Sequence, residues 1–274
     1  MNSRSSLRTK LISSPYVVWS VLFIVAPLIF VVYYSFTDAS GTFTLENITA
    51  LSKYTPTFLR SIWFGIVATI ICLIIAFPIA YIISQKTEKV QRTLVMLIML
   101  PMWMSFLIRT YSWMALLQDT GIINSFLGKL GIDPVHMINT SGAVILGMVY
   151  NFLPYMIMPI YSVMAKLDYS MVEAAQDLGG NRLTVIRRCI IPMSMPGVVS
   201  GVTMVFVPSV STFYISQKLG GGSFDLIGDV IERQFQQSYN YNLGASLSLV
   251  LMVLILISMA VMNHFTDDEE GMVI

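Results

Sequence analysis

The residues of this chain that could do chemistry are few and widely separated. A phosphate-binding loop needs the pattern Gly-x4-Gly-Lys-Ser/Thr, because its amides and its lysine hold the nucleotide. The fragment Gly-Lys-Leu at 128–130 fails at its last position, and no Lys-Ser/Thr pair follows the triple glycine at 220–222. His136 and His264 have no Ser, Cys or carboxylate companion within an apolar segment. We therefore expect no catalytic residue, no metal site and no cofactor held by this chain.

A polar stretch at 166–196 has the features of a docking element. Asp168 can cap a helix whose first turns contain Glu173, Ala174 and Ala175. The Gly-Gly-Asn sequence at 179–181 predicts the end of that helix. Small residues at this spacing allow close approach by another backbone, so we expect the tip to contact a separate protein rather than lipid.

A second short amphipathic helix is expected after the glycines. It places three apolar residues on one face and two basic residues toward water, namely Leu183, Ile186 and Ile190 against Arg187 and Arg188. Pro192 and Pro196 are expected to break this helix before the next apolar segment begins. The predicted product is a compact helix–turn–helix that projects from its surroundings.

The composition places the elements around this stretch in a membrane. Of the 274 residues, 55% are hydrophobic and 11% are charged, whereas a soluble domain carries about a quarter charged residues. The net charge of +1 gives no argument for binding nucleic acid. Cys72 and Cys189 are too few for a disulfide framework, and we interpret both as small buried hydrophobic residues.

Six segments are long and apolar enough to cross a bilayer core, which takes about 20 residues. They span about 15–34, 61–83, 94–117, 142–164, 194–213 and 243–263. The first follows basic residues but is too long for a signal peptide and lacks a cleavage site, so it is expected to stay as a span. The predicted fold is all-α: a single polytopic membrane helical bundle over 1–274.

Lys and Arg residues set the orientation of such a bundle. With a cytoplasmic N-terminus at 1–14, the inner segments hold ten of these residues: Arg4, Arg8, Lys10, Lys86, Lys89, Arg92, Lys166, Arg182, Arg187 and Arg188. The outer segments hold five: Lys53, Arg60, Lys129, Lys218 and Arg233. Both termini, including the tail 264–274, are therefore expected in the cytoplasm.

The stretch from Glu173 to Pro192 resembles the EAA loop of ABC importer permeases. Glu173-Ala174-Ala175-x3-Gly179 matches the start of that pattern. Cys189-Ile190-Ile191-Pro192 stands where the family has Ile-x-Leu-Pro, so Cys189 and Ile191 depart from the pattern, each with another apolar residue. The segments 101–113, 150–168 and 213–235 are similar to the first permease subunit of spermidine/putrescine importers. The resemblance implies the type I ABC importer permease fold with six transmembrane helices.

The same resemblance implies partners and functional residues. A second homologous permease, two copies of a cytoplasmic ABC ATPase that binds ATP and Mg²⁺, and an external solute-binding protein would complete the importer. The coupling contacts carried over to this chain are Glu173, Ala174, Ala175, Gly179 and Pro192. The chain itself would be non-catalytic.

A polyamine pathway would favour aromatic side chains, because ring faces attract ammonium groups. The candidates are Trp103, Tyr111, Tyr150, Tyr155 and Tyr214, although each could equally belong to an interfacial aromatic belt.

Arg109 lies inside the third span, where a cation is costly unless it faces protein or water. It would suit an oxyanion such as sulfate, thiosulfate or phosphonate, so an anion importer stays open as an alternative. An intramembrane enzyme or scaffold is a further alternative. Gly197-x3-Gly201 indicates close helix packing.

Overall fold

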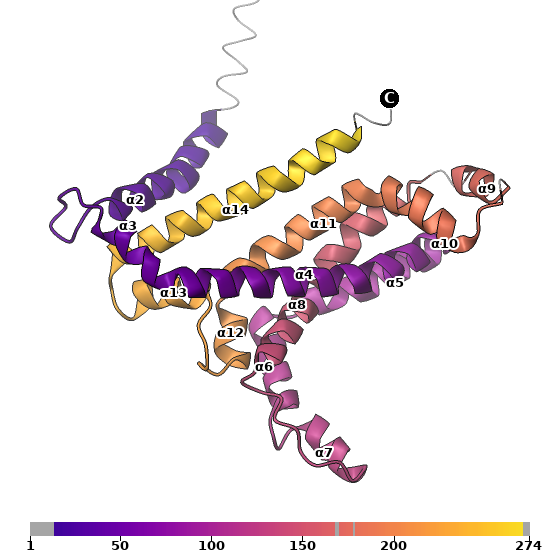
Figure 1. Cartoon of the computed structure of the whole chain (residues 1–274), viewed down its shortest axis with the longest axis horizontal. Coiled ribbons are helices and arrows are strands. Elements are labelled where there is room, and N and C mark those ends of the chain that lie inside the picture. The colour runs from indigo at the N-terminus through magenta and orange to yellow at the C-terminus, as the bar shows by residue number, and fades with distance from the viewer. Residues whose placement is uncertain (1–13, 168–169, 178, 271–274) are drawn as a thin grey trace, which may run out of the picture. The chain divides into compact units, whose positions relative to one another are not determined.

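The structure is a computed structural model that describes residues 14–167, 170–177 and 179–270, with side chains as far as residue 262. Its regular structure is helical in the described part (Figure 1). In chain order the elements are η1 (Val21–Val25), α2 (Ala26–Ser35), α3 (Glu46–Ala50), η2 (Leu51–Tyr54), α4 (Thr55–Ser84), α5 (Glu88–Met99), η3 (Leu100–Trp103), α6 (Phe106–Leu117), α7 (Ile122–Lys129), α8 (Ser141–Met164), α9 (Ser170–Asp177), α10 (Arg182–Val185), η4 (Ile186–Ile190), α11 (Ile191–Ser211), α12 (Tyr214–Leu219), α13 (Ile227–Gln236) and α14 (Tyr241–Glu270).

Five continuous helical segments in the described part are long and apolar enough to cross a membrane. They are Ser14–Ser35, Glu46–Ser84, Ser141–Met164, Arg182–Ser211 and Tyr241–Met262. A sixth crossing requires the bent pair Glu88–Trp103 and Phe106–Lys129, whose axes differ by 87°. The third apolar segment at 94–117 is therefore not one straight helix.

The bend has a local cause in the sequence. Pro101 removes one intrahelical donor, and α5 tightens into the 3₁₀ turn η3 at that point. Met104 and Ser105 then take extended backbone angles, with ψ of 148° and 132°. The amide of Arg109 restarts the hydrogen-bond ladder on the carbonyl of Ser105, 3.1 Å away.

The chain divides into two compact units, and the first comprises residues 1–55 and 230–254. Within it, the loop after α2 is joined to the start of α14 by Asn242, whose amide donates to the carbonyls of Thr37 (2.7 Å) and Tyr34 (3.2 Å). The side-chain hydroxyls and the backbone amides of Ser40 and Thr42 donate to Asp38 and hold the pKa of its carboxyl well below the usual range. This loop is thus a defined turn.

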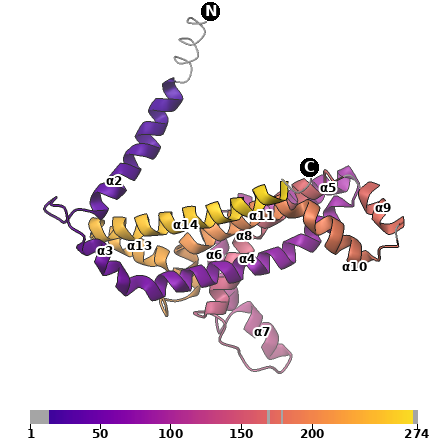
Figure 2. The ribbon, with the colours of Figure 1, turned by 45° about the horizontal axis from the view of Figure 1, so that its top comes forward.

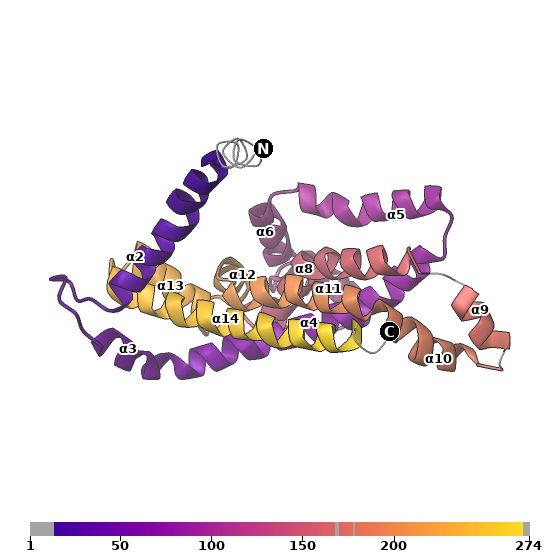
Figure 3. The ribbon, with the colours of Figure 1, turned by 90° about the horizontal axis from the view of Figure 1, so that it is seen from above.

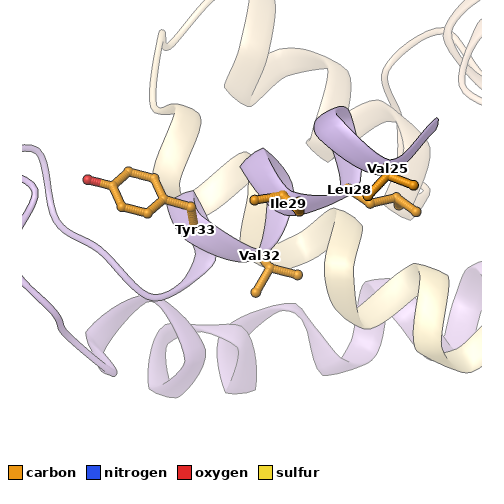
Figure 4. Close-up of a pocket in the computed structure, with 5 residues that line it drawn as sticks. All are labelled: Val25, Leu28, Ile29, Val32 and Tyr33. Atoms are coloured by element: carbon orange, nitrogen blue, oxygen red, sulfur yellow. The ribbon is translucent and has the colours of Figure 1, made fainter. Parts of the chain in front are cut away.

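The same unit carries a hollow of about 370 Å³ on the first helix, lined by side chains of η1 and α2 (Figure 4). The lining residues are Val25, Leu28, Ile29, Val32 and Tyr33, all from one helix. An apolar lining of this kind offers no charged group to a polar solute.

The second unit, residues 56–229 and 255–274, is built around α8 and α11. A Cβ on Gly197 would lie 2.8 Å from the carbonyl oxygen of Pro159, and one on Gly201 would lie 2.8 Å from Sδ of Met156. Only a hydrogen fits at either contact, which confirms the close packing expected from the Gly-x3-Gly spacing. The two helices run side by side in Figures 1 and 3.

The expected break between the coupling segment and the fifth span is wrong. α10, η4 and α11 follow one another without interruption, as Arg182–Ser211. Pro192 and Pro196 both lie within this run, and each removes one amide donor from the hydrogen-bond ladder without ending the helix. The five-residue π-helical turn η4 accommodates the join, as such turns do within longer helices.

A second hollow of about 430 Å³ lies between α4, α11 and the 255–262 part of α14. It is lined by Ile66, Thr69, Ile70, Leu73, Val202, Phe206, Ile257, Ser258, Val261 and Met262. None of these side chains is charged, so this hollow too lacks a group that would hold an ion.

Candidate coupling loop and substrate pathway

The predicted docking element is a helix–turn–helix built from α9 and α10. The amide of Gly179 donates to Gln176 (2.8 Å) and that of Gly180 to Ala175 (3.1 Å), which closes the end of α9. Gly179 has a φ of +83°, in the left-handed region that favours glycine. The helix end expected at 179–181 is thus confirmed.

Asn181 also starts the next helix. Its side-chain oxygen accepts from the amide and the hydroxyl of Thr184, both at 2.8 Å, as an N-cap residue does. Asn181 was predicted only as part of the end of the preceding helix, and its capping contact was not predicted. The Asn-x2-Thr spacing is the feature of the sequence that indicates this cap. The cap expected from Asp168 lies outside the described residues.

The residues expected to couple to an ATPase lie on the outside of this element. Glu173, Ala174, Gly179 and Pro192 are exposed, and Ala175 is half-buried. Buried Val172 and Val185 hold the element against the core instead. An exposed carboxylate beside small side chains leaves room for another protein. That these residues touch an ATPase stays a prediction.

The apolar face expected for the second helix needs a correction. Ile190 is buried and Ile186 half-buried, but Leu183 is 74% exposed. Val185 takes the inward position, because the π turn that follows shifts the side-chain register of the helix. Arg187 and Arg188 are exposed as expected. The tip therefore presents an apolar side chain as well as a carboxylate.

Figures 2 and 3 both show α9 and α10 beyond the ends of α8 and α11. The element therefore projects from the second unit, as a docking element must.

Two of the five candidate pathway aromatics come together. The rings of Tyr111 on α6 and Tyr214 on α12 lie 6.2 Å apart, edge to face, and Phe106 lies 6.0 Å from Tyr214. We call Phe106, Tyr111 and Tyr214 the aromatic cluster. Tyr111 is 44% exposed, so the described part of this chain does not enclose the cluster.

The other three candidates lie apart from this cluster. Tyr150 packs its ring edge to face on Trp113, with centroids 5.3 Å apart. Trp103 is 74% exposed on η3, and Tyr155 is also exposed on α8. The structure thus singles out Tyr111 and Tyr214 among the predicted aromatics. Their part in transport stays a prediction.

A cation lies at each end of the aromatic cluster. The Lys218 ammonium is 5.4 Å from the Tyr111 ring centroid and 5.7 Å from that of Tyr214. The Arg109 guanidinium carbon is 5.9 Å from the Phe106 centroid. All three distances fall within cation–π range. Sequence reasoning missed Lys218, although its spacing of four from Tyr214 puts the two on one face of a helix.

Arg109 is buried, with 8% of its surface exposed. Its Nε and Nη1 atoms have no acceptor among the described residues. The side chain thus faces protein, as expected for a cation within a span, but it is not paired inside the described part of the chain.

α12 is held in place by its contact with α8. A Cβ on Gly147 of α8 would overlap the side chain of Leu219 and come within 2.9 Å of Ile215. The missing side chain lets α12 approach closely, and α12 also packs on α6. This packing brings Tyr214 and Lys218 to Tyr111.

A buried carboxylate anchors the segment after α12. Asp229, 3% exposed, accepts from the Ser216 hydroxyl (2.9 Å) and the Leu226 amide (2.8 Å). The Ser61 hydroxyl accepts from the Ile227 amide at 2.7 Å. Asp229 is therefore a structural residue.

Replacing Asp229 by Ala is expected to destabilise the protein. The change leaves the buried Leu226 amide without its acceptor, at about 1–3 kcal/mol for an unsatisfied buried group, whereas the Ser216 hydroxyl can still donate to the Phe213 carbonyl. Thermal unfolding of the purified permease in detergent should show a lower midpoint, and Asp229→Asn should recover part of it. Asp133→Ala, at an exposed carboxylate, is the matched control; an equal fall there would contradict the assignment.

The remaining polar groups include the two histidines of the chain. His136 pairs with Asp119 at 2.9 Å, and both are exposed. Within the described residues, no three His, Cys, Asp or Glu side chains gather as a metal site would require. His264 falls in the part of α14 whose side chains are not described.

Residues 76–267 match the family described as binding-protein-dependent transport system inner membrane component. The chain belongs to this family of inner membrane transport proteins. As a permease of this kind it is a membrane component of a transporter. Its apolar helices and its projecting element belong to such a component. The sequence-based resemblance to ABC importer permeases is confirmed.

Relatives of this permease carry a narrower description. The spermidine/putrescine transport system permease protein PotB of Haemophilus influenzae is 38% identical over 234 residues, which cover 81% of each chain. PotB of Escherichia coli is 39% identical over 227 residues, covering 79% of this chain and 82% of the relative. The likeness to spermidine/putrescine permeases is thus confirmed along four-fifths of the sequence.

Solved structures show the fold. A chain of a bacterial ABC transporter that imports the acidic polysaccharide alginate superposes with a TM-score of 0.77 at 16% identity, covering 98% of this permease and 99% of that chain. A second alginate transporter structure, in complex with a periplasmic protein, gives 0.77 at 17% identity and covers 96% and 95%. The permease therefore has the type I ABC importer fold.

Proposed function

We propose that this permease carries polyamines, spermidine or putrescine, into the cytoplasm as one subunit of an ATP-driven importer. The observation that carries the proposal is its 38–39% identity to PotB proteins over about four-fifths of both chains. The open aromatic cluster supports it, because ring faces lower the cost of stripping water from an ammonium.

The proposed assembly contains four kinds of subunit. This permease pairs with a second, homologous permease, two copies of a cytoplasmic ABC ATPase, and an external solute-binding protein. The sequence has no Gly-x4-Gly-Lys-Ser/Thr motif, so the ATPase binds ATP and Mg²⁺ and this subunit is non-catalytic. The excess of Lys and Arg on one side supports cytoplasmic termini.

The proposed coupling runs through α9 and α10. When ATP closes the ATPase dimer, the ATPase subunit that binds Glu173, Ala174 and Gly179 moves the projecting element. α10 continues into α11 without a break, so the shift reaches Ser211, three residues before Tyr214 of the aromatic cluster. The pathway thereby opens to the outside of the cell and receives solute from the binding protein. After ATP hydrolysis it releases the solute to the cytoplasm.

Arg109 favours a second candidate, an oxyanion importer. Its buried guanidinium has two nitrogen atoms without an acceptor in the described part, and an oxyanion would supply acceptors.

Reconstitution of the complete importer tests the two candidates. Spermidine-loaded binding protein should stimulate ATP hydrolysis and drive uptake of labelled spermidine into proteoliposomes. Stimulation by sulfate-loaded binding protein alone would overturn the polyamine assignment. Failure with both would exclude both substrate classes while leaving the transporter family intact.

A further inference from the structure

Lys218 has an unusual environment for a lysine. Its ammonium lies within 6 Å of two phenol ring centroids, at 5.4 Å from Tyr111 and 5.7 Å from Tyr214. No carboxylate lies within ion-pair distance of it among the described residues. The side chain is half-buried, so the two rings replace part of the water that an ammonium normally keeps.

The group held by these rings has the chemistry of the proposed solute. A lysine side chain is a chain of four methylene groups ending in a primary ammonium, and a diamine or polyamine ends in the same group. A pair of rings that binds the first can bind the second. The position of the Lys218 ammonium therefore indicates which chemical group the Tyr111–Tyr214 pair can bind.

The charges around the cluster bear on when such a solute could enter. Lys218 lies at one end, and Arg109, over Phe106, lies at the other. Two fixed cations repel a third, and a tethered ammonium is present at a high effective concentration. A free ammonium can reach the rings only after Lys218 has moved away.

We propose that Tyr111 and Tyr214 form a binding subsite for a primary alkylammonium, which Lys218 occupies in this conformation and vacates when the ammonium of the solute enters. The assignment rests on the proposed polyamine function for its physiological ligand. It makes Lys218 an internal competitor that weakens solute binding and thereby favours release.

The position of Lys218 suits this role. It is on α12, the short helix that follows α11 after Thr212 leaves the helical conformation with a ψ of 145°. α12 packs on α6 and on Gly147 of α8. A small displacement of α12 along α6 changes the distance between Lys218 and the Tyr111 ring. Occupancy by Lys218 is thus tied to the packing of α12.

The test uses the complete importer in nanodiscs and n-butylammonium as the probe, measured by saturation-transfer NMR without binding protein. Lys218→Met keeps the length of the side chain and removes the ammonium. We expect it to bind the probe at least about tenfold more tightly than the parent, because the tethered competitor is gone. Lys218→Arg, which keeps a cation over the rings, should bind as weakly as the parent.

A double variant identifies the rings as the source of the gain. Lys218→Met with Tyr214→Leu should return probe binding to the parent level. Equal binding by the parent and Lys218→Met, or a gain that survives in the double variant, would overturn the subsite. Lys218→Gln serves in place of Met if the thermal unfolding midpoint of the Met variant falls.

Uptake by the parent importer separates the two hypotheses. If the parent imports spermidine and Lys218→Met shows no gain in probe affinity, the subsite is wrong and the proposed function holds. If the gain appears but the parent does not import spermidine, the subsite stands and the polyamine assignment fails.

Discussion

Replacing Glu173 by Lys is expected to abolish ATP-driven uptake while leaving the permease folded and inserted. Glu173 is exposed on α9, so the reversal of its charge disturbs no internal contact of the described chain. If the Glu173 side chain contacts an ATPase, Glu173→Lys places a cation against an ATPase surface that accommodates a carboxylate. Losing a docked charge contact costs about 2–5 kcal/mol, enough to reduce uptake by more than about tenfold.

Solute uptake into proteoliposomes and co-purification of the ATPase would measure this effect. Glu46→Lys makes the same charge change at an exposed position on α3 and is the matched control. Both variants should reach the membrane in equal amount with equal unfolding midpoints. Normal uptake by Glu173→Lys would show that the projecting element does not couple to the motor.

Replacing Gly197 by Leu is expected to prevent stable folding of the second unit. Even a Cβ at this position would lie 2.8 Å from the Pro159 carbonyl and 3.0 Å from the Ile160 Cα. These are backbone atoms of α8, so a helix must move, and overpacking of this kind costs about 1–3 kcal/mol or more. Gly197→Ala should lower the unfolding midpoint, and Gly197→Leu should leave little monodisperse protein.

Gly142→Ala provides the comparison for this series. Gly142 lies on α8. A Cβ there would meet only the Thr140 hydroxyl at 3.7 Å, which is an ordinary van der Waals contact. Its unfolding midpoint should match that of the parent in detergent. A Gly197→Ala variant as stable as Gly142→Ala would show that α8 and α11 are not packed at this distance.

The sequence indicated the membrane fold well because apolar length and glycine spacing depend on local residues alone. The Gly197-x3-Gly201 packing and the helix end at Gly179 both followed from residue type and spacing. Pro192 was misread because a proline removes one hydrogen bond from a helix but does not always end it. The run 182–211 continues past both Pro192 and Pro196.

The candidate site was harder to predict because it depends on contacts between distant segments. Tyr111 and Tyr214 lie about a hundred residues apart in sequence, and only the packing of α12 on α6 brings them together. Lys218 was counted as one cation of an external segment, which says nothing of the rings beside it. Leu183 was predicted to be buried because a regular α-helical period was assumed. The π turn changes that period, and Leu183 is exposed.

The unbroken run Arg182–Ser211 has a mechanical consequence. Thirty helical residues extend about 45 Å, the length of a rod that crosses the bilayer. Such a rod transmits a movement of one end to the other, except where the π turn at 186–190 or the missing amides of Pro196 and Pro208 let it bend. The stiffness of these positions would then determine how much of the movement produced by the ATPase reaches Tyr214, three residues beyond the end of the run.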